Sequence, residues 1–448
     1  MWFPFNISII QHAHLSETKE KILRNLFWSV LGKIVTLLGG LLVGIIVARY
    51  LGPEKYGLMN YVISIIAIFM IFAQFGFDLI EIREEARKPS MRDYVIGTVL
   101  CLRIAFAIIS LAAIIIYVLL FEDDSYVRLL IMIYSISIIL SAFNVARNHF
   151  TALVWNEYVV KTEILRTIIG ISIKVILLLS DASLIWFISS LVFDSLLLAS
   201  GYMVSYKKKI DSPCKWKFNP TIAKYLIQQS FPLLLSGAAI IIYERIDQVM
   251  IGNMLDKTSV GYYSVAVRFV EVLIFIPTII AQTISPILAK NYQENKQLYK
   301  RNAEIFVNIT TWISIGVAVL LSFIAFPIVL LTFGKLYLPA APILSIMSFK
   351  VIGAAMAQTS GQLIIIERKQ KWVSLRNILG CLICITLNFI LIRKYGADGA
   401  AMVSIITIIV SGFIANFIIT PYIHIFKMQV ASIIYGWKDI IHIKQLFK

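Results

Sequence analysis

The stretch EILRTIIGISIKVILLLS, residues 163–180, is apolar enough to cross a bilayer, yet it contains Glu163, Arg166 and Lys174. Together with Gly170, these residues are three, four and four positions apart, which places them on one face of a helix. A charged side chain is costly in the centre of a bilayer. The stretch therefore predicts a membrane-spanning helix that turns one charged face away from lipid.

The whole chain has the composition of an integral membrane protein. Of its 448 residues, 59% are hydrophobic and only 15% are charged, and the mean hydropathy is +0.84. Only helix bundles and closed barrels satisfy their backbone hydrogen bonds inside lipid. Apolar runs of about 20 residues without two-residue alternation favour helices. We therefore expect an all-α integral membrane protein.

Twelve runs have the length and composition of membrane-spanning helices. They lie near residues 25–48, 58–77, 94–120, 127–147, 159–179, 183–206, 224–252, 260–288, 304–331, 339–366, 372–392 and 400–423. The basic stretch YKKKIDSPCKWKFNP, residues 206–220, divides them into six and six. We therefore expect an N-terminal six-helix bundle (residues 1–206), a basic linker (207–220) and a C-terminal six-helix bundle with a tail (221–448).

A weak internal repeat relates the two halves. The stretch leaving the first span aligns without gaps with the stretch leaving the seventh, at an offset of 204 residues, which pairs Leu51 with Leu255 and Gly57 with Gly261. Two halves of the same topology are typical of transporters, in which the pathway lies between the halves.

Small residues in the first span predict close helix packing. Gly40, Gly44 and Ala48 recur every four residues, and such a stripe lets a neighbouring helix approach. Gly52 and Pro53 then end the helix, because glycine tolerates the turn and proline cannot continue the hydrogen bonding. A tight antiparallel hairpin is expected here.

Basic residues are unevenly divided between the two sides of the predicted membrane. The chain has 41 Lys and Arg, of which nine lie within spans and 26 lie on the side of both termini and the linker. The six on the other side are Arg49, Lys55, Lys257, Lys335, Arg393 and Lys394. Loops rich in Lys and Arg remain in the cytoplasm, so we expect both termini and the linker to be cytoplasmic.

The sequence contains no motif of an enzyme. Phosphate-binding loops of the GxxxxGK[ST] and GxGxxG types and the zinc motif HExxH are absent. Cys381 and Cys384 have CxxC spacing, but they lie inside an apolar helix, where a structural role is expected. We therefore expect no catalytic residue, no cofactor, no metal site and no nucleic-acid partner.

Four motifs, in order, resemble the polysaccharide transport family. They are ARYLGPEKYG (48–57), FGFD (75–78), PTIIAQTISPILAK (277–290) and YGADGAA (395–401). This family includes the Wzx-type O-antigen flippases, in a superfamily with multidrug and toxic-compound exporters and the lipid II flippase. The resemblance covers roughly residues 21–425.

The resemblance implies a V-shaped pair of bundles around a central cavity that opens alternately to each side. It also implies transport of an undecaprenyl-pyrophosphate-linked oligosaccharide, such as an O-antigen or capsule repeat unit, from the cytoplasmic to the periplasmic leaflet of the bacterial inner membrane. Membrane lipids, a polysaccharide polymerase and a chain-length regulator are the implied partners. The charged head group of such a substrate needs cations at membrane depth.

Nine cations lie within the predicted spans. Three of them, Arg103, Arg128 and Arg376, are within about two turns of a span end and are expected to reach the membrane surface. The other six are the candidates for a cavity that binds the anionic head group: Lys33, Arg166, Lys174, Arg245, Arg268 and Lys350.

Sequence neighbours rank these candidates. Arg245 has nearby acids such as Asp247, and Arg268 has Glu271 three residues on, so each has a structural alternative. Arg166 lies one turn from Glu163. No acid lies near Lys174 in the sequence, so Lys174 is the favoured substrate contact.

Acids within the spans are candidates for binding the proton or sodium ion that drives transport. Asp194, Asp247 and Glu271 have this potential, as does Glu244, but each could instead neutralise a neighbouring cation. Energy coupling therefore stays open at this stage.

Two alternatives remain. A cation-coupled multidrug exporter of the same fold should present acids to cationic drugs, and the first span has Lys33 but no acid between Asn25 and Val47. A membrane-bound glycan polymerase or ligase should have a large periplasmic loop, and the longest loop on that side is about ten residues.

Overall fold

The computed structural model describes residues 17–210 and 215–439, which form helices and no strands. The helices before the linker are α1 (Glu17–Gln74), α2 (Phe77–Arg87), α3 (Arg92–Phe121), α4 (Ser125–Leu140), α5 (Asn144–Ala152), α6 (Asn156–Leu179) and α7 (Leu184–Lys209). Those after it are α8 (Pro220–Met254), α9 (Lys257–Glu294), α10 (Lys296–Thr332), α11 (Ala340–Met347), α12 (Lys350–Ile366), α13 (Val373–Ile409), α14 (Ala415–Ile418) and α15 (Ile423–Tyr435). The expected all-α membrane fold is confirmed.

Nine helical segments within the described residues are long and apolar enough to cross a membrane. Two of them contain a sharp turn at a glycine with positive φ: Gly52 (φ 72°) in α1 and Gly396 (φ 61°) in α13. Each of these therefore holds two of the expected spans. α6 is not among the nine, because it carries the three charged residues of the stretch 163–180.

Some expected spans are broken. The run 127–147 comprises α4, a short 3₁₀ turn and the start of α5, and the run 339–366 comprises α11 and α12. A π-helical turn, Val410–Ile414, separates α13 from α14. Hydropathy alone does not detect such local changes in hydrogen bonding, because the residues on both sides are apolar.

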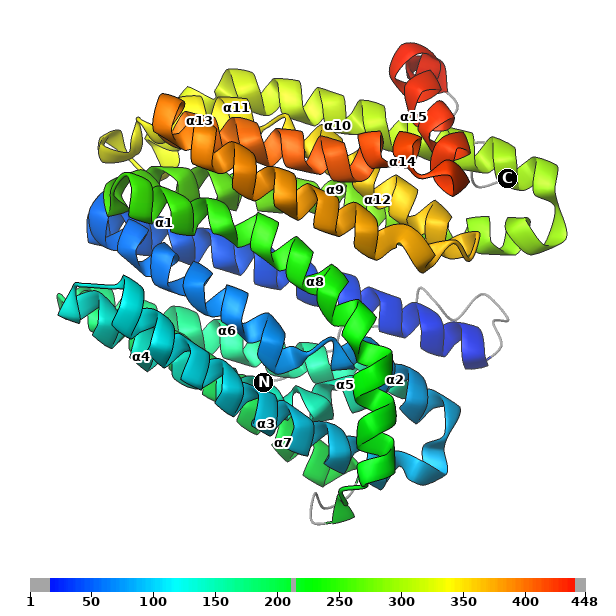
Figure 1. Ribbon diagram of the computed structural model, residues 1–448, viewed down its shortest axis with the longest axis horizontal. Coiled ribbons are helices and arrows are strands. Elements are labelled where there is room, and N and C mark those ends of the chain that lie inside the picture. The colour runs from blue at the N-terminus through cyan, green and yellow to red at the C-terminus, as the bar shows by residue number, and fades with distance from the viewer. Residues whose placement is uncertain (1–16, 211–214, 440–448) are drawn as a thin grey trace, which may run out of the picture.

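The helices form two groups with α1 and α8 between them (Figure 1). α1 packs against α3, α4 and α6 of the first group and against α8 and α9 of the second. α8 contacts α2 and α3, and it also packs extensively against α13. We call the two ends of the molecule the Gly52 end, after the turn in α1, and the linker end, where α7 stops and α8 begins.

The two halves meet closely at the Gly52 end. A Cβ atom on Gly57 would lie 1.7 Å from the carbonyl oxygen of Lys257, and one on Gly261 would lie 2.1 Å from that of Pro53. Only glycine permits this backbone approach. The glycines paired by the internal repeat therefore lie in one contact between the halves. The Tyr337 hydroxyl also donates to the Ala48 carbonyl oxygen at 2.7 Å.

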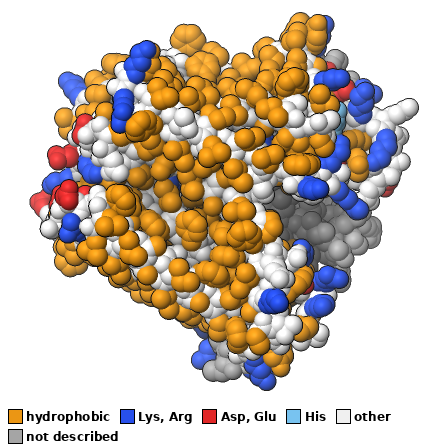
Figure 2. All heavy atoms as spheres, in the orientation of Figure 1, with side chains coloured by type: hydrophobic (Ala, Val, Ile, Leu, Met, Phe, Trp, Pro, Cys, Tyr) orange, Lys and Arg blue, Asp and Glu red, His pale blue; other side chains and the backbone are white. Residues whose placement is uncertain are grey.

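The outer surface matches a membrane environment. Figure 2 shows a broad hydrophobic area across the middle of one face, with charged side chains toward the ends of the helices. Large apolar residues such as Leu120, Leu179 and Phe323 are exposed. The chain is thus a multi-pass membrane protein.

Candidate functional site

A cavity of about 260 Å³ lies between α1, α6, α7 and α9. Its charged lining residues are Arg166 and Lys174 from α6, Asp194 from α7 and Arg268 from α9. Four residues predicted from the sequence thus come together. Because Arg268 belongs to the second half, the cavity lies where the halves meet.

The small-residue stripe of α1 lines this cavity. A Cβ atom on Gly40 would meet nothing within 4 Å, and one on Gly44 would lie 3.4 Å from Arg268 Nε. The expectation that the stripe packs against a neighbouring helix is therefore wrong for Gly40, whereas Gly44 is buried next to Arg268 of α9. Close packing on α6 instead uses Gly32 and Gly39, whose added Cβ atoms would lie 2.8–2.9 Å from side chains of that helix.

Lys174 is held by an acid from the next helix. Its Nζ lies 2.7 Å from Asp194 Oδ2, and its side chain is only 11% exposed. The two residues are 20 positions apart, so helical spacing did not reveal the pair. Gly170 permits the contact, because a Cβ there would lie 2.4 Å from Asp194 Oδ1. The premise that Lys174 lacks an acidic partner is wrong.

Arg166, in contrast to Lys174, lacks the acidic partner that the sequence offered. The Glu163 carboxylate, one turn away, accepts a hydrogen bond from the Tyr202 hydroxyl at 3.2 Å and lies 3.7 Å from Arg147 Nε. Among the described residues, no carboxylate forms an ion pair with Arg166, and its buried Nε has no hydrogen-bond partner. Arg166 is therefore the cavity cation most available to an anionic ligand.

Two arginines share one acid beside the cavity. Glu271 lies 3.8 Å from Arg268 Nη1 and 3.3 Å from Arg245 Nη2, and all three side chains are partly exposed. The predicted pairing of Arg268 with Glu271 is confirmed. The predicted pairing of Arg245 with Asp247 is wrong, since Arg245 reaches across from α8 to α9.

Asp247 is buried away from any ion pair. It is 1% exposed and accepts hydrogen bonds from the Tyr263 hydroxyl (2.5 Å), Asn388 Nδ2 (2.6 Å) and Cys384 Sγ (3.4 Å). Within the described ranges no cation lies within 4 Å of its carboxylate. The Asn388 Oδ1 atom is buried without a partner. Cys384 thus has a contact inside the helix bundle, as its apolar setting predicted.

The other two predicted lysines lie outside the cavity lining. Lys33 is exposed on α1, one turn before the lining residue Thr36 and on the same face of the helix. Lys350 begins α12 and is partly buried.

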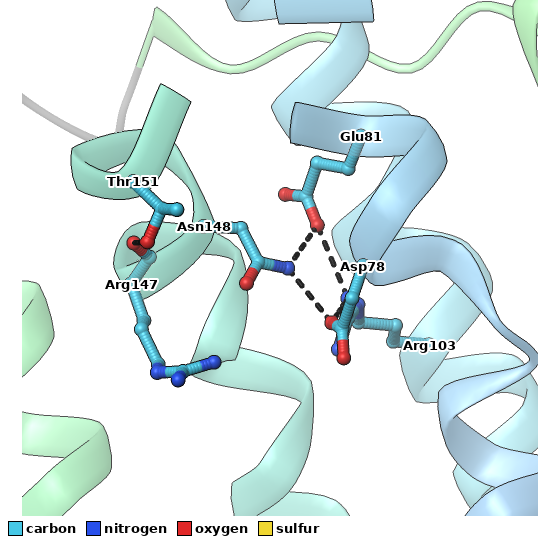
Figure 3. Close-up of polar contacts among 6 residues, drawn as sticks. All are labelled: Asp78, Glu81, Arg103, Arg147, Asn148 and Thr151. Atoms are coloured by element: carbon cyan, nitrogen blue, oxygen red, sulfur yellow. Dashed lines mark hydrogen bonds and ion pairs between the residues drawn. The ribbon is translucent and has the colours of Figure 1, made fainter. Parts of the chain in front are cut away.

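Two cations expected to reach the membrane surface are buried instead. Arg103 is 1% exposed and contacts Asp78 (2.5 Å) and Glu81 (3.1 Å), while Asn148 Nδ2 donates to both of these acids (Figure 3). Positive φ angles at Phe75 and Gly76 turn α2 so that its acids face α3. These two residues belong to the motif FGFD.

Arg376 is the second cation that was expected at the membrane surface and is buried instead. It is buried, and its Nη1 donates to Ser360 Oγ at 3.0 Å. Arg128 lies near a helix end as expected, where its Nε donates to the Glu122 carbonyl oxygen at 2.5 Å. No spacing in the sequence predicts the Arg376 contact, because Ser360 lies on a different helix.

Comparison with known proteins places the chain among proteins of polysaccharide biosynthesis. A family described as polysaccharide biosynthesis protein matches residues 46–342. The capsular polysaccharide biosynthesis protein CapF of Staphylococcus aureus is 24% identical over 412 residues, which cover 88% of this chain and 97% of that protein.

Solved structures share the fold. The lipid II flippase MurJ in an inward closed conformation has a TM-score of 0.69 and 18% identity, with 92% of each chain covered. A multidrug resistance transporter of the MATE family in an inward-facing conformation has a TM-score of 0.65 and 14% identity, with 92% of this chain and 95% of that chain covered. The expected fold, which these solved structures share, is thus confirmed.

Proposed function

Because the chain belongs to the polysaccharide biosynthesis protein family, we propose that it is a flippase for a lipid-linked oligosaccharide. It moves an undecaprenyl-pyrophosphate-linked repeat unit of an O-antigen or capsule from the cytoplasmic to the periplasmic leaflet of a bacterial inner membrane. The reaction is transport by alternating access and involves no covalent chemistry. The likeness of its fold to a lipid II flippase supports this substrate class.

The cationic cavity is the observation that carries the proposal. Its lining has three cations, Arg166, Lys174 and Arg268, and one acid, Asp194. A pyrophosphate that joins lipid to sugar bears a negative charge on each phosphate group and cannot cross hydrocarbon alone. Partly buried cations attract such an anion more strongly than exposed ones, because the surrounding dielectric is lower. The polyprenyl tail can stay in lipid.

Each predicted cation has a distinct role in this proposal. Arg166 contacts the pyrophosphate directly, since no carboxylate of the described residues pairs with it. The anion also competes with Asp194 for Lys174 and with Glu271 for Arg268. Arg245 shares Glu271 with Arg268. Lys33 attracts the head group at the cavity mouth. Lys350 would contact the substrate only in another arrangement of the two halves.

The contact at the Gly52 end indicates toward which side of the membrane this conformation is closed. Backbone packing of Gly57 against Gly261 closes that end between the halves. The excess of basic residues at the linker end supports a cytoplasmic location for that end. We therefore assign this conformation to the stage that is closed toward the periplasm. A periplasm-specific reporter fused after Lys217 should give no signal, whereas a strong signal would reverse the assignment.

For ion coupling, Asp247 is the best supported of the four candidate acids, and Glu244 is exposed. Asp194 and Glu271 are already neutralised by cations. Among the described residues, Asp247 accepts hydrogen bonds from neutral donors only, and a buried carboxylate is costly unless a proton or metal cation joins it. A proton or sodium ion at Asp247 is therefore the proposed driving ion.

Gene deletion in the host tests the function. Cells without the protein should lose long surface polysaccharide and retain lipid-linked repeat units at the cytoplasmic face, and the intact gene should restore export. Normal surface polysaccharide in a strain with no second flippase would exclude the proposal. Loss of resistance to cationic dyes with normal polysaccharide would favour a drug exporter. A polymerase and a chain-length regulator are the proposed downstream partners.

A further inference from the structure

A buried histidine–glutamate pair lies at the linker end of the N-terminal half, outside the cavity. His149 Nδ1 on α5 and Glu85 Oε2 on α2 are in hydrogen-bond contact. The residues are only 3% and 4% exposed. Their remaining polar atoms, His149 Nε2 and Glu85 Oε1, are buried and have no partner in the part of the chain that the structure describes. The pair is therefore sequestered but only half satisfied.

The neighbouring acids of α2 differ from Glu85 in that they contact a cation. Asp78 and Glu81 both contact the Arg103 guanidinium and both accept from Asn148, which precedes His149 on α5 (Figure 3). Asp78, Glu81 and Glu85 are three and four positions apart, so they lie on one face of α2. Arg103 is occupied by the first two acids, and Glu85 depends on His149.

His149 also contacts the route from α7 to the linker. Its ring lies edge-on to Tyr206 at a centroid distance of 5.3 Å. Tyr206 lies edge-on to Trp216 at 5.1 Å, and the Trp216 indole N–H donates to the Tyr206 hydroxyl at 3.0 Å. Trp216 belongs to the segment that joins the two halves. A line of direct contacts thus runs from α2 to this segment.

The segment is docked on the N-terminal half and leads directly into α8. The Lys217 backbone N–H donates to the Asp93 carbonyl oxygen at 3.0 Å, and a Cβ on Gly97 would lie 2.5 Å from Lys217 N. The Asn219 backbone N–H donates to Thr98 Oγ1, and the Asn219 side chain caps α8. Docking here fixes the start of α8, which packs against α13 of the other half.

We propose that the His149–Glu85 pair is a proton-binding site that controls how residues 215–219, and with them the start of α8, dock on the N-terminal half. In the state with one proton, the proton lies between Nδ1 and the carboxylate. A second proton, taken from water, goes to Nε2 and creates a buried N–H without an acceptor and a new charge beside Tyr206. The site must rearrange to accommodate this donor, and Tyr206 transmits the change to Trp216.

Other charges set the pH at which the pair titrates. Carboxylates favour the second proton and arginines oppose it. The groups on the surrounding elements are Asp78, Glu81 and Glu84 of α2, Arg92, Asp93 and Arg103 of α3, Arg147 of α5, Glu163 of α6, the Tyr206 phenol of α7, Lys217 of the linker segment and Tyr225 of α8. An unperturbed histidine titrates near pH 6.5. Burial of the pair disfavours the added charge, so the transition is expected at lower pH, between about pH 4 and pH 6.5.

Tryptophan fluorescence of the purified full-length protein tests the proposal without requiring transport. The difference between the emission of the wild-type protein and of the Trp216→Phe variant isolates the Trp216 signal. This signal should show a single titration step between about pH 4 and pH 6.5. The step should be lost when His149→Gln is introduced into both proteins. The rate of tryptic cleavage within residues 207–217, divided by the rate for His149→Gln at the same pH, should change over the same interval.

Two matched variants separate proton binding from folding. His424→Gln removes a different histidine at the linker end, bound to Glu367, and should leave the Trp216 titration intact. Tyr206→Phe keeps the ring but removes the acceptor for the Trp216 N–H, so it should abolish the titration. A normal elution volume and a cooperative thermal transition should show that this variant is folded. A Trp216 signal that does not vary with pH in folded wild-type protein, or one that titrates equally in folded His149→Gln, would overturn the proposal.

Discussion

Gly170 of α6 lies directly against the carboxylate of Asp194 of α7, so that any Cβ at residue 170 would come within 2.4 Å of Asp194 Oδ1. This approach brings the other carboxylate oxygen to 2.7 Å from Lys174 Nζ. The absence of a side chain at one position therefore determines which cavity cation is neutralised. Arg166, one turn earlier on the same face, has no equivalent acid among the described residues.

Substitution Asp194→Asn is expected to destabilise the protein, because it leaves Lys174 without its counter-charge. The cost should be about 2 kcal/mol, below the roughly 3–5 kcal/mol for a fully buried pair, since both side chains reach the cavity. The double variant Asp194→Asn, Lys174→Gln should recover part of this loss. Thermal unfolding of the four proteins in the same detergent measures the coupling. Additive effects of the two changes would show that the pair contributes no interaction energy.

Gly170→Ala should act on the same pair from the other helix. The added methyl group cannot fit without moving the Asp194 carboxylate. Its effect on the unfolding temperature should therefore be smaller in the Asp194→Asn background than in the wild type. Gly40→Ala is the control, because its methyl group would enter open space in the cavity. Equal effects of Gly170→Ala in both backgrounds would contradict the geometric explanation.

Arg166→Gln should impair glycan export more than Lys174→Gln, at normal membrane abundance. Arg166 has the more accessible charge, and loss of a hydrogen bond to a charged ligand costs about 1.5–3 kcal/mol, or roughly 10- to 100-fold in binding. Lys174→Arg should retain more activity than Lys174→Gln. Complementation of a deletion strain, scored beside immunoblots of membranes, provides the measurement. Lys290→Gln, at an exposed residue remote from the cavity, is the control. Full export by the double glutamine variant would remove both residues from the substrate path.

The sequence predicted which residues face the cavity better than it predicted which residues pair. Spacing on one helix correctly placed Arg166, Gly170 and Lys174 on one face, because a helix has a fixed period. Asp194 pairs with Lys174 from the following helix, and such contacts depend on the rotation and depth of two helices. The available signal was weak: a glycine one turn before Lys174 and a single acid within α7.

The partners of the buried cations were also not predictable from the sequence. Arg103 was expected to reach the membrane surface because it lies near a span end, but two acids of α2 hold it inside the protein. Hydropathy treats α2 as a polar loop and contains no information on the direction in which Phe75 and Gly76 turn it. The all-α class and the approximate positions of most spans were predictable because they depend on local composition, whereas this ion cluster depends on tertiary structure.

Gly57→Ala should weaken the closed contact at the Gly52 end. The methyl group would lie 1.7 Å from the Lys257 carbonyl oxygen, a backbone atom that cannot move without shifting α9. The conformational equilibrium should therefore move toward states in which this end is open. A cysteine introduced at Thr36 should become more reactive toward a membrane-impermeant reagent added from the Gly52 end. Gly261→Ala should have the same effect, whereas Gly316→Ala, at a position with open space, should not. Unchanged reactivity in both inter-half variants would show that this contact does not limit opening.

Glu367 should make the linker end of the C-terminal half sensitive to acid. Its carboxylate accepts from Lys369 Nζ at 2.7 Å and from the Tyr299 hydroxyl at 2.9 Å, and it lies 2.9 Å from His424 Nε2. Burial raises the pKa of Glu367, but the hydrogen bonds from His424 and Lys369 outweigh burial and lower the pKa from 4.5 to about 2. Because the pKa is lower in the folded protein, the ionised carboxylate stabilises the fold above pH 4.5. This contribution is lost progressively as the pH falls from 4.5 toward 2.

Glu367→Gln should therefore reduce stability at pH 7 by up to about 3 kcal/mol, the equivalent of the lowered pKa. The difference between wild type and variant should shrink as the pH falls below 4.5, because the wild-type carboxylate then becomes neutral as well. Thermal unfolding of both proteins from pH 7 to the lowest pH at which they stay soluble provides the test, with Glu294→Gln as the control at an exposed acid. Since Glu367 links α10, the α12–α13 turn and α15, its loss should also increase hydrogen exchange in α15. A difference in stability that stays constant across this pH range would show that the three contacts do not depend on the charge of Glu367.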